Sequence, residues 1–400
     1  MLENALHGRP RYWATLAGLA ALFALGAGFW CRQLADGLVV TGMGRDVSWG
    51  LYIAQFTFLA GVAASAVMVV LPYVFHQAKE FARIAVLGEF LAVAAVVMCM
   101  GFILADLGQP RRVLNVMLYP TLHSMMFWDM VSLSGYLVLN VMVGWTGLQA
   151  LRNGMVPPRW VGVLAVIGVV WAFSIHTVTA FLYAGLPGRP YLLTAILAAR
   201  FLASAFCSGP AILLLLVLFV RRVTGFDPGR TAVARLAVFI VYAMCVNVFF
   251  FLLELFTAFY SHMPGHIAPI RSLFAQTPMA PVMWTEAVLG LGSLALLIPP
   301  RLRRRPRVLI FGLCLLVVAT WIDKGFGLLV GGFTPNPFGT VTPYWPTVSE
   351  LMVSLTLYAL GGIILVVLWK VALSVRAEVE AGNVSCVAEE PGRCPGRRRR

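Results

Sequence analysis

Long apolar runs separated by short polar stretches dominate this 400-residue chain. Ten of the runs reach about the 20 residues that a membrane-spanning helix needs. Breakers such as Gly108-Gln109-Pro110, Pro157-Pro158 and Asp227-Pro228-Gly229 stand between runs and mark turns. The pattern predicts spanning helices at 12–33, 48–75, 81–105, 124–150, 159–184, 191–220, 232–260, 282–299, 307–330 and 348–374.

The composition is that of a membrane protein and excludes a soluble one. Apolar residues make up 60% of the chain and charged residues only 12%, whereas soluble domains carry about 25% charged residues. The net charge of +14 does not indicate nucleic-acid binding, because the basic residues form short clusters between apolar runs. We therefore predict an all-α integral membrane protein with ten transmembrane helices.

The basic residues are distributed unequally between the two sides of the membrane. With ten helices, 22 Lys and Arg residues lie on the side of the two termini, seven lie on the other side, and Lys324 lies within a helix. Because cytoplasmic segments carry the excess of Lys and Arg, both termini are predicted to be cytoplasmic. The polar tail at 375–400, which ends in four arginines, is predicted to be a disordered cytoplasmic basic tail near anionic lipid.

The loops on the predicted outer side are long, rich in Pro, Gly and aromatic residues, and poor in charge; they cover 34–47, 106–123, 261–281 and 331–347. Such loops suggest a docking surface for another protein. Anchoring of Trp and Tyr side chains at the lipid headgroups is an equally good interpretation.

Ionisable residues inside spanning helices mark function by default, because a charge that faces lipid costs at least a few kcal/mol. The candidates are Glu89, Asp106, Asp129, His176, Glu254, Glu286, and Asp323 with Lys324. A structural interpretation is at least as good for these groups: Glu89 can snorkel or pair with Arg83, and Asp106 can cap its helix or pair with Arg111. Asp323 and Lys324 can largely neutralise nearby charges. For Asp129, His176 and Glu254 we favour function.

Three of the polar residues share a depth in the membrane. Gln55, Asp129 and His176 are each expected roughly 8–12 Å below the outer surface at 1.5 Å rise per residue. Trp49 and Tyr52 precede Gln55, and Phe56 follows it. Glu254, Glu286 and Asp323 form a similar layer in the later helices. Helices two to five and six to nine thus resemble a parallel repeat.

The histidine count argues against haem in this chain. A transmembrane cytochrome b needs pairs of axial histidines on facing helices. Only His176 lies well inside a span. No CxxC cluster or Gly-rich phosphate loop is present either, so we expect neither haem, iron–sulfur cluster nor metal site.

Six different short motifs follow one another along the chain in a characteristic order. They are Trp49-Gly50-Leu51-Tyr52-Ile53-Ala54-Gln55-Phe56, Asp106-Leu107-Gly108-Gln109-Pro110, Phe127-Trp128-Asp129, Ser174-Ile175-His176, Arg200-Phe201-Leu202-Ala203-Ser204 and Glu254-Leu255-Phe256. Together they resemble the NrfD/PsrC family, the quinone-interacting membrane subunits of polysulfide-reductase-like complexes. The resemblance covers about residues 10–375. The helix count and the segment at 87–95 look most like the DsrP branch, from the Dsr sulfur-metabolism electron-transfer complex.

This resemblance implies a fold, a substrate and partners. It implies two four-helix bundles at 48–184 and 191–330, flanked by peripheral helices at 1–33 and 348–374. It implies a quinone pocket in the first bundle, near a periplasmic ferredoxin-like iron–sulfur subunit, with a cytochrome and further membrane subunits in the complex. It also implies the bacterial cytoplasmic membrane and no cofactor in this subunit. Some members carry a histidine near the start of the first core helix, and Gln55 occupies that neighbourhood here.

We therefore expect a subunit that exchanges electrons between menaquinone or ubiquinone and its partner. Two electrons and two protons move in quinol chemistry, so groups must bond the two ring oxygens and exchange protons. His176 and Asp129 are the predicted catalytic pair. Trp49, Tyr52, Gln55 and Phe56 are predicted to bind the quinone.

A second class of function fits the same pattern. A secondary transporter or proton channel would also use ten helices in two repeats with buried acids. The scarcity of Gly or Pro breaks in mid-membrane helices argues against it. In a combination of the two, Glu254, Glu286 and Asp323 would form a proton path coupled to quinone turnover.

Overall fold

The computed structural model describes residues 3–75 and 78–388, and ten helical segments of this part are long and apolar enough to cross a membrane. They are α2 (Pro10–Asp36), α3 (Leu51–Ala63) continued by η2 (Ala64–Ala66) and α4 (Val67–Phe75), α5 (Ala82–Asp106), α7 (Met125–Arg152), α8 (Arg159–Ala184), α9 (Ile196–Thr224), α10 (Arg230–Tyr260), α12 (Ala280–Leu297), α14 (Pro306–Ile322) continued by η6 (Asp323–Val330), and α15 (Val348–Ala388). Each overlaps one predicted span. The predicted all-α membrane fold is confirmed.

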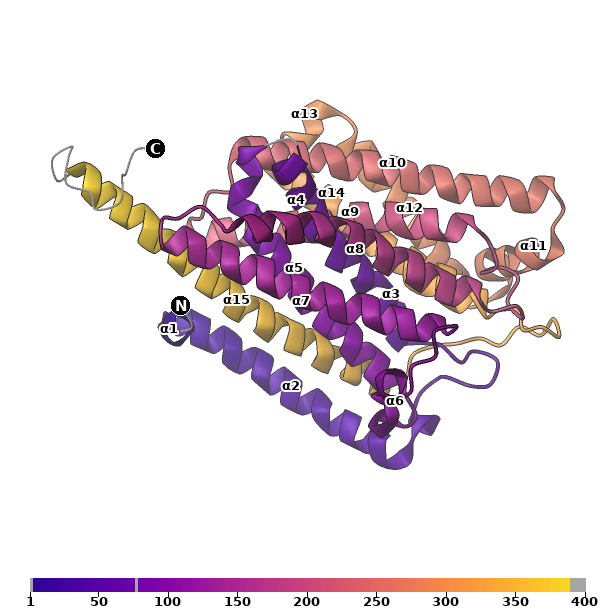
Figure 1. Ribbon diagram of the computed structural model, residues 1–400. Coiled ribbons are helices and arrows are strands. Elements are labelled where there is room, and N and C mark those ends of the chain that lie inside the picture. Colours follow the sequence, from indigo (N-terminus) through magenta and orange to yellow (C-terminus); the bar gives the residue numbers. More distant parts are fainter. Residues whose placement is uncertain (1–2, 76–77, 389–400) are drawn as a thin grey trace.

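Short helices lie in the connections between the spans. They are α1 (Glu3–Leu6), η1 (Leu38–Val40), η3 (Lys79–Phe81), η4 (Pro110–Arg112), α6 (Asn115–Leu118), α11 (Pro264–Arg271), η5 (Ser272–Gln276) and α13 (Pro300–Arg303). The start of α2 and the far end of α15 lie at one end of the molecule, and α6 and α11 lie at the other (Figure 1). Following the predicted topology, we call these the inner and the outer end.

We describe the helix contacts by the two predicted sets of four. In the first bundle α3–α4, α5, α7 and α8 contact one another, and in the second α9 contacts α10 and α14 while α12 contacts α14. Helix α2 packs mainly along α15, which in turn packs on α5 and α7 of the first bundle. The two helices outside the bundles are therefore both attached to the first one.

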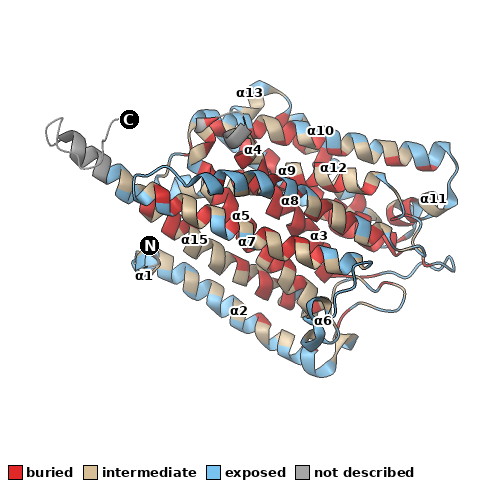
Figure 2. Cartoon of the chain, in the orientation of Figure 1, coloured by how far each residue is buried: buried red, intermediate tan, exposed pale blue. Residues whose placement is uncertain are grey.

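Helix α3 lies at the junction of the two bundles. All of its residues are buried, and it contacts α5 and α8 on one side and α9 and η6 on the other. Buried residues gather along α3, α5 and α9, whereas α2 is mostly exposed (Figure 2). Two glycines allow the bundles to meet closely: a Cβ on Gly209 of α9 would lie 2.7 Å from the carbonyl oxygen of Gly61 on α3.

The structure differs from the sequence expectations at three places. Helix α15 continues to Ala388 instead of ending at 374, so the first part of the expected tail is helical; residues 389–400, the rest of the predicted disordered tail, lie outside the described residues. The second span is interrupted by the 3-10 turn η2, and the ninth ends in the π-helical η6. The backbone of the spans is thus less regular than the scarcity of Gly and Pro breaks suggested.

Candidate functional site

A hydrogen bond between α7 and α8 fixes Asp129 in the outer half of the first bundle. The hydroxyl of Thr179 donates to Oδ1 of Asp129 at 2.6 Å, and both side chains are buried. A hydrogen bond to an ionised group contributes about 1.5–3 kcal/mol, so this contact holds the carboxyl group against α8.

His176 lies one turn before Thr179 on the same face of α8. Because Thr179 bonds Asp129, the two predicted catalytic residues are linked to the same segment of α8. Its Nδ1 bonds the backbone carbonyl of Ala172 at 2.8 Å. In a neutral imidazole this assigns the proton to Nδ1 and leaves Nε2 as an acceptor. Among the described residues Nε2 has no partner, although the side chain is only 1% exposed. A buried polar atom of this kind marks a place where a ligand can bind.

A cluster of aromatic rings lies around Tyr183, one turn beyond Thr179 on α8. Trp49, just before α3, lies 5.4 Å from the ring of Tyr183 on α8 and 5.6 Å from that of Phe333. The Tyr183 hydroxyl shares a 2.6 Å hydrogen bond with Thr57 of α3. Tyr183 also contacts Phe201 of α9, with 5.6 Å between ring centroids. Helices α3, α8 and α9 are thus joined by one aromatic cluster at the depth where a quinone ring is expected.

The other predicted quinone-binding residues make different contacts. The Tyr52 hydroxyl donates to Oε1 of Gln33 on α2 at 2.6 Å. The Gln55 oxygen accepts hydrogen bonds from Trp321 at 2.9 Å and Tyr358 at 2.5 Å, so it links α3 to α14 and α15. Phe56 of α3 is buried in the hydrophobic core of the protein. Of the four residues, Trp49 makes an aromatic contact with α8. The quinone-binding function of the set stays a prediction.

In the second bundle a buried arginine joins two of the predicted proton-path acids. Arg200 donates from its two terminal nitrogens to Glu254 of α10 and to Asp323 of η6. The charge count places Arg200 with the outer loops, but it lies inside α9 and is 3% exposed. Its spacing on α9 gives no signal of these partners, which come from helices far along the chain. Glu286 is half-buried on α12 and forms no ion pair within the described part of the chain.

Lys324 follows Asp323 but does not neutralise it by direct contact. Its ammonium group lies 5.1 Å from the ring centroid of Phe201 and has no hydrogen-bond partner in the ranges described. A Cβ on Gly61 would lie 2.8 Å from this nitrogen, so the glycine makes room for it. If all four groups are ionised, the charges of Arg200, Lys324, Glu254 and Asp323 sum to zero.

The π-helix η6 begins at Asp323, where the buried charges gather. π-Helical turns are rare and occur frequently at functional sites. Gly325 in this segment packs against α3, because a Cβ there would lie 3.2 Å from Cβ of Ala54. The glycines at 325 and 327 were the available sequence signal, but neither indicates a π-helix by itself.

Two of the outer loops are joined near Trp49 through Arg189, which lies between α8 and α9. Arg189 donates to the backbone carbonyls of Asp46 at 2.8 Å and Phe333 at 2.9 Å, and Thr342 donates to the Asp46 carboxylate at 3.0 Å. Hydrogen bonds with Asn336 and Thr342 lower the pKa of Asp46 below its ordinary value. The loops at 34–47 and 331–347 are therefore held together.

Comparison with known proteins gives consistent results. The profile of the family described as Polysulphide reductase, NrfD matches residues 39–336. A Halobacterium salinarum protein named as a membrane subunit of dimethyl sulfoxide reductase is 27% identical over 87% of this chain and 88% of its own length. A Hdr-like menaquinol oxidoreductase integral membrane subunit of Archaeoglobus fulgidus is 23% identical over 89% of this chain and 92% of its own. A selenate reductase subunit of Mesobacillus selenatarsenatis is 26% identical over 47% and 52%, respectively.

The matched residues include the whole of both bundles, and the relatives carry names of membrane subunits or of reductase subunits. A match of this extent, on an all-α chain with ten candidate spans in its described part, assigns the protein to a family. The chain belongs to the polysulphide reductase NrfD family of integral membrane proteins.

Proposed function

We propose that this chain is the quinone-interacting subunit of a membrane oxidoreductase complex, and that it exchanges electrons between the quinone pool and an iron–sulfur partner on the outer side. The observation that carries the proposal is the unpartnered Nε2 of His176, one turn from the Thr179 that holds Asp129. The printed names of the relatives support a role within a multi-subunit redox complex.

In this proposal the two ring oxygens of the quinone meet His176 and Asp129. During quinol oxidation, Nε2 of His176 accepts the proton of one hydroxyl and the Asp129 carboxylate accepts that of the other, while two electrons leave to the partner. Quinone reduction runs these steps backwards. Trp49 supplies a flat apolar wall for the ring. A positioned acid or base contributes roughly 10²–10⁴-fold to a rate.

The proposal extends to partners and location. The joined outer loops above Trp49 would receive the periplasmic ferredoxin-like iron–sulfur subunit, and a cytochrome and further membrane subunits complete the complex. Both termini face the cytoplasm. The name of the Archaeoglobus relative favours menaquinone. The likeness to the DsrP branch favours sulfur metabolism. We expect that the redox centres reside in the partner subunits.

Proton translocation is a further part of the proposal. Glu254 and Asp323 are linked through Arg200, and Oε1 of Glu254 has no partner in the described residues. With the half-buried Glu286 they would form the proton path of the second bundle. The irregular η6 beside these charges also favours the second candidate, a transporter or proton channel. Purification separates the two: a redox subunit is isolated with iron–sulfur and cytochrome partners, whereas a transporter is isolated alone.

The test uses His176→Ala and Asp129→Asn in the purified complex. We expect both variants to assemble and to lose quinol-linked electron transfer by about a hundredfold. Binding of the quinone analogue 2-heptyl-4-hydroxyquinoline N-oxide should weaken in both. Thr177→Ala, next to His176 on another face of α8, is the control and should behave as wild type. Near-wild-type turnover in both site variants would refute the assignment of the pocket.

A further inference from the structure

A stripe of buried residues runs along one face of α7. Asp129, Ser132, Tyr136, Asn140 and Gly144 are spaced by three or four positions, so they lie one above another on the helix. All five are buried. Residues on other faces of the same helix are exposed: Val138, Val141 and Met142. The polar groups of α7 therefore point into the bundle rather than to lipid.

Glu89 of α5 lies at the inner end of this stripe. A Cβ on Gly144 would lie 3.0 Å from its Oε2, so the carboxylate packs directly against α7. The alternative pairing with Arg83 does not form, because Arg83 contacts Asp227, at 3.9 Å from its carboxylate. Glu89 is 7% exposed and makes no ion pair within residues 3–75 and 78–388. An ionisable residue inside a membrane span is energetically costly, so a buried acid without an ionic partner is a candidate functional residue.

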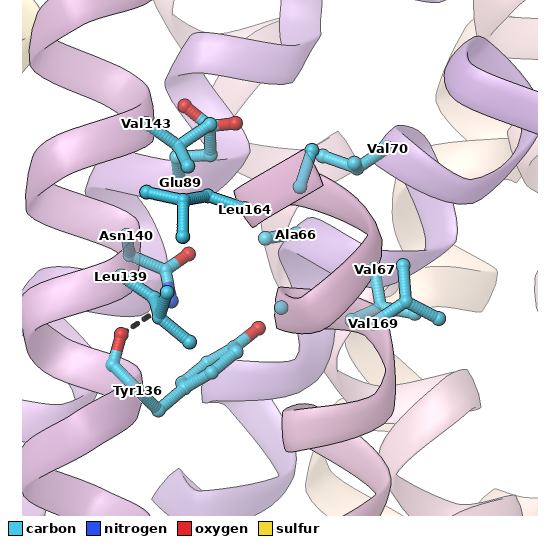
Figure 3. Close-up of a pocket in the computed structure, with 12 residues that line it drawn as sticks. Ala66, Val67, Val70, Glu89, Tyr136, Leu139, Asn140, Val143, Leu164 and Val169 are labelled. Carbon is cyan, nitrogen blue, oxygen red and sulfur yellow. Dashed lines mark hydrogen bonds between the residues drawn. The ribbon is translucent and has the colours of Figure 1, made fainter. Parts of the chain in front are cut away.

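A small cavity connects Glu89 to the stripe. It has a volume of about 30 Å³ and is lined by Glu89, Tyr136 and Asn140 together with apolar side chains. Figure 3 shows Glu89 at one end of the cavity, the Tyr136 ring at the other, and Asn140 between them. One water needs roughly 10–15 Å³ of such space, so about two waters fit. The side-chain amide nitrogen of Asn140 donates a hydrogen bond to the backbone carbonyl of Tyr136 at 2.8 Å. The side-chain oxygen of Asn140 can then accept a hydrogen bond from water.

From Tyr136 the stripe continues to the candidate quinone site. The Tyr136 hydroxyl donates to the carbonyl of Ala63 at 3.3 Å, and Asp129 lies two turns further along α7 with Ser132 between. Gly144 and Asp129 are about 22 Å apart along the helix axis at 1.5 Å per residue. Glu89, the cavity and the stripe thus cross the middle of the first bundle, from its inner half to Asp129 in its outer half.

We propose that Glu89, the cavity waters and Tyr136 form a proton route between the cytoplasm and Asp129. The proposal rests on the proposed function and adds a branch in the first bundle, separate from Glu254 and Asp323. When quinone is reduced, a proton from the cytoplasm binds the Glu89 carboxylate and crosses the cavity waters. It is then exchanged at the hydroxyls of Tyr136 and Ser132 and reaches Asp129, which passes it to the ring oxygen. Electrons come from the iron–sulfur partner. Quinol oxidation reverses each step.

The experiment compares Glu89→Gln and Tyr136→Phe in the intact complex, reconstituted in liposomes with a pH-sensitive dye on the side of the termini. Both substitutions nearly keep the size of the side chain. They remove the carboxyl group of Glu89 and the hydroxyl group of Tyr136, which are the groups that take up and release the proton. We expect turnover to fall at least about tenfold, and the pH change on that side to disappear in proportion. Glu378→Gln is the matched control: it removes an acid near the inner end of α15 that is 47% exposed and pairs with Arg152 at 3.7 Å.

Binding of 2-heptyl-4-hydroxyquinoline N-oxide separates the two proposals. Unchanged binding in Glu89→Gln with slow turnover supports the route. Wild-type turnover and an unchanged pH signal in Glu89→Gln overturn it, while the quinone site at His176 stands. If the wild-type complex binds no analogue, the proposed function itself fails. A Glu89→Gln complex that does not assemble leaves Tyr136→Phe to decide by the same two measurements.

Discussion

Replacing Arg200 with methionine tests how the second bundle holds its buried charges. Arg200→Met replaces the aliphatic part of the arginine by another unbranched chain. It removes the guanidinium group that bonds both Glu254 and Asp323. The two carboxylates then remain buried, at 4% and 7% exposure, without their common partner. Breaking a buried ion pair from one side costs about 3–5 kcal/mol, because an uncompensated charge is left behind.

At about 1.4 kcal/mol per factor of ten, this predicts a fall of two to three and a half orders of magnitude in the folding equilibrium constant. The measurement is reversible unfolding in mixed micelles of mild detergent and sodium dodecyl sulfate. Arg235→Met is the control, because the Arg235–Glu80 pair lies at the surface and such pairs contribute about 0–1 kcal/mol.

The double variant Arg200→Met, Glu254→Gln separates charge from packing. It leaves Asp323 with Lys324 as the remaining buried cation, so the buried charges again sum to zero and most of the lost stability should return. Wild-type stability in Arg200→Met, or a double variant as unstable as the single one, would refute the assignment of Arg200 as the counter-charge of this cluster.

Two further predictions follow from the packing and the charge pattern. Gly209→Ala should destabilise the protein by about 1–3 kcal/mol in the same assay, since its Cβ would lie 2.7 Å from the backbone oxygen of Gly61. Gly147→Ala on α7, which has open space around it, is the control and should not destabilise the protein. Equal stability of both variants would contradict the close contact of α3 with α9. Reporter fusions after residue 388 should be active with a cytoplasmic reporter and silent with a periplasmic one, and the opposite pattern would invert every depth given above.

The ten spans, their order and the acids that they contain were all predictable from the amino-acid sequence. Twenty apolar residues in a row suffice to predict a spanning helix, because the cost of exposing a polar backbone to lipid is local to each segment. The depth of Asp129 and His176 followed in the same way, since rise per residue is fixed within a helix. The short motifs were enough to indicate the family that the profile match then showed.

The contacts of these residues could be learned only from the packed helices. Gln55 meets Trp321 and Tyr358, and Arg200 meets Glu254 and Asp323, through contacts between segments far apart in the chain. The pairing of Glu89 with Arg83 was reasonable from sequence spacing, but the rotation of α5 turns the carboxylate towards Gly144 instead. The rotation of each helix is set by packing against all its neighbours at once. In a chain so uniformly apolar, the hydrophobic pattern fixes where a helix crosses the membrane but barely constrains which face turns inward.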